Sequence, residues 1–186
     1  MWVFVLTAII QSANPLIVEA KKTSKYIYEK RLRQLYAGVM WISFFVSLIL
    51  SIFASPIIII LYGEAFSGSI DILRVITWCV AFSYLGVSRG IWLILENKQK
   101  YIKYLSFYGV IFNFGLNYLL IPLFSTVGAA LATLITQILV SIIIPLFIKE
   151  LRQNSLIILD ALLLKDVIQK DTIMKYIGIL KNKIKI

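Results

Sequence analysis

The sequence of 186 residues contains no histidine and a single cysteine, Cys79, which stands inside an apolar run. Without histidine the chain lacks the commonest general base and the commonest zinc ligand. One cysteine forms neither an internal disulfide nor a metal-ligand pair. The sequence also shows no paired acid and base of the kind that group transfer requires. We therefore expect no enzyme, no metal site and no cofactor.

Charged residues are scarce, at 15% of the chain, whereas 60% of the residues are hydrophobic. The mean hydropathy of +0.90 is typical of membrane proteins and argues against a water-soluble enzyme. In a soluble protein the net charge of +10 would suggest nucleic acid as a partner. Here Lys and Arg lie between and after long apolar runs, so the expected neighbours are membrane lipids and not nucleic acid.

The apolar runs predict an all-α fold, a polytopic membrane helical bundle of about five transmembrane helices with an amphipathic cytoplasmic tail. The five expected spans cover about residues 2–18, 35–61, 72–95, 104–121 and 127–148. Within the second span, Pro56 predicts a kink or an early end. The bundle then comprises 1–148 and the basic tail 149–186, where Asp160 divides an apolar run too short to cross a bilayer.

Basic residues alternate between successive connections. There are six in 21–34, one in 62–74, three in 96–103, none in 122–126 and eight after residue 148. Because cytoplasmic connections carry the excess of Lys and Arg, we expect the C-terminus and the 21–34 connection to be cytoplasmic. Met1 then lies outside, as in a chain whose upstream helices are missing.

The stretch from Gly109 to Ser141 carries the most specific pattern. Asn117-Tyr-Leu-Leu-Ile-Pro122 is followed by Gly128-Ala-Ala-Leu-Ala-Thr133. Pro122 is expected to end a helix, and Gly128 with Ala132 to let the next helix approach its neighbours closely. Together with Leu61-Tyr-Gly-Glu-Ala-Phe66, this pattern resembles the C-terminal part of Wzx-type O-antigen and polysaccharide flippases. These belong to the multidrug/oligosaccharidyl-lipid/polysaccharide exporter superfamily.

The resemblance covers about residues 1–155, less than half of such a transporter. It implies a multi-pass bacterial inner-membrane protein that moves polyprenyl-pyrophosphate-linked oligosaccharide repeat units by alternating access. The transport would serve O-antigen, capsule or lipopolysaccharide biosynthesis. The implied partners are the lipid-linked oligosaccharide, the missing N-terminal half of the transporter, and polysaccharide polymerase and glycosyltransferases.

Other functions remain open on the sequence. One alternative keeps the superfamily and changes the cargo, to a drug or cation exporter or a peptidoglycan-precursor flippase. Cation-coupled exporters need buried carboxylates, and none stands mid-span here. The other alternative is a non-transporting structural membrane protein or an inactive gene fragment.

Polar residues inside spans must face another helix or a wet cavity. Asn113 and Asn117 are four apart on one helical face, as are Thr133 and Gln137 on the next. These four residues are expected either to line a hydrophilic path for sugars or to bond the two helices to each other.

Arg89 is the one charge well inside a span. It is expected either to extend toward the headgroups or to hold the substrate's pyrophosphate. On the same span, Gly86 and Gly90 predict a face for close helix packing. In the first span, Asn14-Pro15 predicts a kink or a hinge for alternating access.

Overall fold

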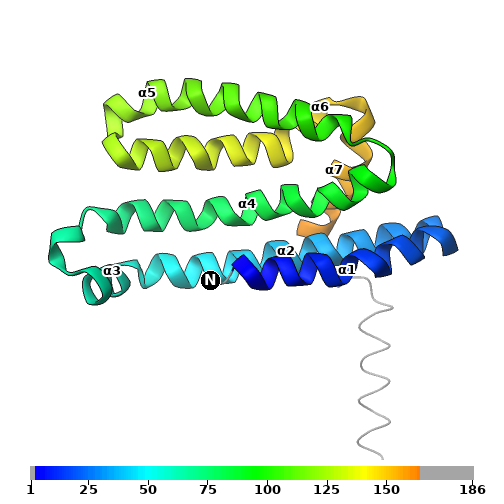
Figure 1. The fold of residues 1–186 in the computed structure, drawn as a ribbon, viewed down its shortest axis with the longest axis horizontal. Coiled ribbons are helices and arrows are strands. Elements are labelled where there is room, and N and C mark those ends of the chain that lie inside the picture. The colour runs from blue at the N-terminus through cyan, green and yellow to red at the C-terminus, as the bar shows by residue number, and fades with distance from the viewer. Residues whose placement is uncertain (1–2, 164–186) are drawn as a thin grey trace, which may run out of the picture.

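The computed structural model describes residues 3–163, which form helices and no strand (Figure 1). The elements are α1 (Val3–Thr23), α2 (Lys25–Ile52), α3 (Ala54–Tyr62), the 3-10 helix η1 (Glu64–Phe66), α4 (Ser69–Leu95), α5 (Lys100–Ile138), the π-helical segment η2 (Leu139–Ile143), α6 (Ile144–Phe147) and α7 (Lys149–Leu162). Four stretches are long and apolar enough to cross a membrane: α1, α2, α4 and the continuous run Lys100–Phe147. The predicted all-α membrane bundle is confirmed.

The connection predicted at residues 21–34 is helical. Lys21 and Lys22 form the last turn of α1, and α2 begins at Lys25, so Ser24 alone separates the two helices. Lys and Arg are good helix formers, and cations in the last turn interact favourably with the helix dipole. The charged cluster therefore contains the junction of two helices and not an extended loop.

The second predicted span is two helices. The break lies at Phe53, between α2 and α3, and Pro56 stands in the first turn of α3. Proline has no N–H, and its ring clashes with the carbonyl four residues earlier, here that of Ile52. This accounts for a break just before Pro56.

The stretch Lys100–Phe147 folds back on itself at Ser125, whose φ of 51° and ψ of −131° are not helical. We call residues 100–124 the first limb and residues 126–147 the second limb; Figure 1 shows them antiparallel. Pro122, which was expected to end the helix, lies inside it, three residues before the turn. The one long element thus supplies what the sequence predicted as two spans.

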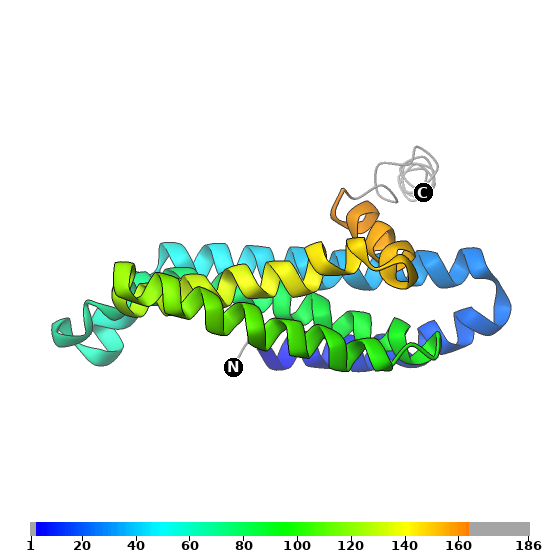
Figure 2. The ribbon, with the colours of Figure 1, turned by 90° about the horizontal axis from the view of Figure 1, so that it is seen from above.

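The core is built around α2, which packs against α1, α4 and α7, while α4 also packs against α5. Figure 2 shows α7 on one face of the bundle, across its long axis. The buried apolar residues of α7, Leu151, Ile157, Ile158 and Ala161, belong to the same hydrophobic cluster as Leu32, Tyr36 and Leu85. The apolar face of the predicted amphipathic tail is therefore covered by protein along α7. The rest of the predicted tail lies outside the described residues.

The ends of the bundle differ in charge. The α1–α2 junction, the turn between α4 and α5, and α7 lie toward one end, which we call the basic end (Figure 1). The turns at residues 63–68 and at Ser125 lie at the other end. This arrangement is the one that the alternation of basic residues predicts for a membrane bundle.

Candidate functional site

A polar groove runs between the two limbs of α5. Its volume is about 620 Å³, and its polar lining consists of Ser106, Asn113, Asn117, Thr133, Thr136 and Gln137. The fold-back at Ser125 turns the two predicted polar faces toward each other. Asn113, Asn117, Thr133 and Gln137 thus share one groove. Sequence analysis missed Thr136, although it stands three residues after Thr133 and so on the same side of the helix.

The side chains of the groove are only partly bonded to each other. Asn117 Nδ2 donates to the Asn113 backbone and side-chain oxygens at 2.9 and 2.8 Å. A single long contact crosses the groove, from Asn113 Nδ2 to Thr136 Oγ1 at 3.5 Å. Within residues 3–163, Gln137 makes no hydrogen bond, so its amide is available to a ligand or water. Bonding between the limbs accounts for Asn113 and Thr136 but not for Gln137.

At the turn between the limbs, the backbone at Gly128 lies very close to the backbone at the end of the first limb. A Cβ on Gly128 would lie 2.2 Å from the carbonyl oxygen of Leu120 on the first limb. Ala132, one helical turn further on, is completely buried. Both residues thus stand where two segments pack tightly, and Gly128 lets the chain reverse within a few residues of Pro122.

Of the two glycines expected to form a packing face on α4, only Gly86 has a close neighbour. A Cβ on Gly86 would lie 3.3 Å from Ser141 Oγ, whereas one on Gly90 would meet nothing within 4 Å. Ser141 Oγ also donates to the carbonyl of Phe82 at 2.7 Å. The close approach therefore lies at Gly86, and the prediction of tight packing is wrong for Gly90.

Arg89 is buried, with 1% of its surface exposed. Its Nε donates to Asn154 Oδ1 of α7 at 3.1 Å, and its Nη2 donates to the Ser141 carbonyl of the second limb at 2.7 Å. An arginine that reached for the headgroups would be exposed at its tip and bonded to water. That reading of Arg89 is wrong, because the guanidinium points into the protein.

The partners of Arg89 were not foreseen. Asn154 Nδ2 donates to Tyr36 Oη at 2.7 Å, so one network joins α4, α7 and α2. The backbone carbonyl of Ser141 is able to accept from Arg89 because Pro145, four residues later, has no N–H to occupy it. Pro145 was the one available signal, since a proline in a helix frees the carbonyl four positions before it.

Arg89 retains one nitrogen without a partner. Its Nη1 has no hydrogen-bond partner among the described residues, and Arg89 lines a cleft of about 290 Å³. This cleft and the polar groove share Leu105, Ser106, Gln137 and Val140, so the two lie side by side. Asn14 and Pro15 lie elsewhere, on the exposed side of an α1 that runs unbroken from Val3 to Thr23.

No family model, curated protein or solved structure matches this chain.

Proposed function

We propose that this chain is the C-terminal part of a bacterial inner-membrane transporter that moves polyprenyl-pyrophosphate-linked oligosaccharides for surface polysaccharide synthesis. The observation that carries the proposal is the polar groove between the limbs of α5. Lipid offers no hydrogen bonds, so a lining of amides and hydroxyls at this depth calls for water, a polar cargo or another helix.

The chemistry of the lining suits sugars. Its polar members are uncharged, and amides such as those of Asn117 and Gln137 both donate to and accept from hydroxyl groups. The volume of about 620 Å³ lies within the range of roughly 300 to 1,000 Å³ usual for small-molecule sites. A cation-coupled drug exporter is supported less well, because none of the residues lining the groove is a carboxylate.

Arg89 supplies the cation that a pyrophosphate needs. Arg89 lines the cleft beside the groove, toward the basic end, and its buried Nη1 has no hydrogen-bond partner among the described residues. A guanidinium holds phosphate oxygens through paired N–H donors, whereas an ammonium acts as a point charge. In this reading the sugars occupy the groove while the pyrophosphate lies against Arg89.

The test uses a bacterial strain that lacks its polysaccharide flippase. The strain receives this chain either alone or with the region encoded directly upstream. A site between two bundles needs both, so polymer should return only with the upstream region. In that background Gln137→Leu and Asn117→Leu should reduce export at normal protein levels, whereas Leu119→Ile on the exposed side should not. Full export by a variant that combines Gln137→Leu and Asn117→Leu would refute the proposal.

Arg89 needs a finer comparison because it also holds α7. Arg89→Ala should abolish export, and Arg89→Lys should restore it only partly at equal membrane abundance, since lysine lacks the fork. Complete rescue by lysine would limit the role of Arg89 to its charge and exclude bidentate binding.

The proposed orientation places the basic end and the C-terminus in the cytoplasm. Cysteines introduced at Ser67 and Ser125 in a Cys79→Ala background should react with a membrane-impermeant reagent added to intact cells. A cysteine at Ser24 should react only after the membrane is opened. Labelling of Ser24 with protection of the other two would invert the orientation.

A further inference from the structure

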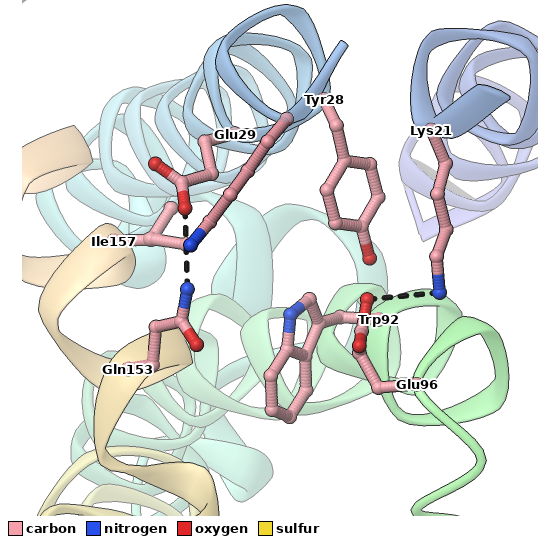
Figure 3. Close-up of a pocket in the computed structure, with 8 residues that line it drawn as sticks. Lys21, Tyr28, Glu29, Trp92, Glu96, Gln153 and Ile157 are labelled. Atoms are coloured by element: carbon pink, nitrogen blue, oxygen red, sulfur yellow. Dashed lines mark hydrogen bonds and ion pairs between the residues drawn. The ribbon is translucent and has the colours of Figure 1, made fainter. Parts of the chain in front are cut away.

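A second pocket, separate from the groove, lies at the basic end. Its volume is about 270 Å³, and four helices contribute to it: Lys21 from α1; Lys25, Tyr28 and Glu29 from α2; Trp92 from α4 with Glu96 directly after it; and Gln153 and Ile157 from α7. Figure 3 shows Tyr28 between the Lys21 side and the Gln153 side, with its hydroxyl directed toward Glu96 and Trp92. Both charge signs therefore meet around one small space.

Several polar groups of this pocket are fixed. Lys21 forms an ion pair with Glu96 at 3.0 Å and also donates to the Leu95 carbonyl. Gln153 Nε2 donates to Glu29 Oε1 at 3.1 Å (Figure 3). These contacts hold the two carboxylates on opposite sides of the pocket (Figure 3).

Two donors are not used. The Tyr28 side chain is 6% exposed, and its hydroxyl lies beside the Glu96 carboxylate without a well-formed hydrogen bond to any residue in the part of the chain that the structure describes. Lys25 is exposed at the rim and forms no ion pair within the same residues. A buried hydroxyl without a partner is unfavourable and points to a ligand that accepts from it.

We propose that this pocket binds the zwitterionic headgroup of a phosphatidylethanolamine. The phosphate accepts from Tyr28 Oη and from the Lys25 ammonium, and the headgroup ammonium donates to Glu29 and Glu96. The elements that line the pocket lie at the basic end of the bundle, and headgroups would meet a membrane bundle at such an end. A volume of about 270 Å³ suits a group of this size and is too small for an oligosaccharide.

The site is tested by adding short-chain phosphatidylethanolamine to the full chain in detergent and counting bound lipid by native mass spectrometry. We expect one tightly bound lipid. Tyr28→Phe and Lys25→Ala should each weaken its binding by about tenfold, since each removes a hydrogen bond to the phosphate. Glu29→Gln should weaken it by about as much, because it removes the negative charge that pairs with the headgroup ammonium. Lys22→Ala, which removes an exposed cation outside the pocket, should leave binding unchanged.

Other probes identify the chemistry. Phosphatidylglycerol carries no ammonium, and phosphatidylcholine carries one that has no N–H to donate, so both should bind at least about tenfold more weakly. Equal binding of either lipid would overturn the assignment. Displacement of the bound lipid by millimolar inorganic phosphate alone would show a phosphate site and would also overturn it. Lys25→Ala keeps the test decisive if Tyr28→Phe unfolds, because Lys25 is exposed. Unchanged lipid binding in Lys25→Ala and Glu29→Gln together would refute the site.

Discussion

Around Arg89, polar side chains from α2, α4 and α7 are buried and bonded to one another, whereas between the limbs of α5 they line an open groove. Arg89, Tyr36 and Asn154 are each at most 1% exposed. Across the groove the single direct contact among the described residues is 3.5 Å long. The first region is built to hold three helices in place, and the second leaves its hydrogen-bonding capacity for something else.

The same comparison holds for apolar residues. On the first limb, Phe114 and Tyr118 are 77% exposed, while Leu32, Val39 and Leu85 around α2 are completely buried. In a membrane the exposed side chains face lipid at no cost, because lipid tails are as apolar as they are. We therefore expect substitutions at the packed region to change folding, and substitutions in the groove to change function.

The largest effect is expected from Asn154→Ala. The change leaves Arg89 Nε and the Tyr36 hydroxyl buried without this partner. Leaving a buried group without its partner typically costs about 1 to 3 kcal/mol and more when the group is charged, and here two groups lose a partner. Denaturant unfolding in detergent should show this loss of free energy, and Arg152→Ala, an exposed neighbour on α7, is the control. A stability loss no greater than that of the control would show that the Arg89 network does not stabilise the bundle.

A smaller effect is expected from Gly128→Ala, at the turn between the limbs. The added Cβ would overlap the Leu120 carbonyl, so the limbs must separate locally. Overpacking of this kind typically costs about 1 to 3 kcal/mol. The matched control is Gly115→Ala, because a Cβ there meets nothing within 4 Å. Thermal unfolding of the two variants should differ, and identical melting temperatures would mean that the turn tolerates a side chain.

The smallest effect on folding is expected from Gln137→Leu. Gln137 makes no hydrogen bond among the described residues, so its loss should change the free energy of unfolding by no more than about 0.5 kcal/mol. The same variant should impair export, which separates the two regions by readout. A destabilisation comparable to that of Asn154→Ala would place Gln137 in the packed region and break the comparison.

Sequence periodicity located the groove because its residues repeat at the spacing of a helical turn. Asn113 with Asn117, and Thr133 with Gln137, are each four apart, and each pair shares a face wherever the helix is regular. The turn between Pro122 and Gly128 then brings the two faces together. Local spacing is sufficient for a site that lies on one hairpin.

The Arg89 network could not be predicted in this way. Tyr36 and Asn154 are 118 residues apart, and no local pattern pairs them. The helical junction at Ser24 was missed for a different reason. Lys and Arg are common in the loops of membrane proteins but are also good helix formers, so a cluster of them does not distinguish a loop from a helix. Spacing predicts which residues share a face, but not which distant helix covers that face.

Pro145 creates the point at which α4 is hydrogen-bonded to the backbone of the second limb. In a regular helix every interior carbonyl is occupied by an N–H four residues later, so a neighbouring helix slides past without finding an acceptor. Proline removes that N–H at one position, and Arg89 Nη2 occupies the freed carbonyl of Ser141. Translation of α4 along the second limb would break this contact. A rotation about Ser141 would preserve it.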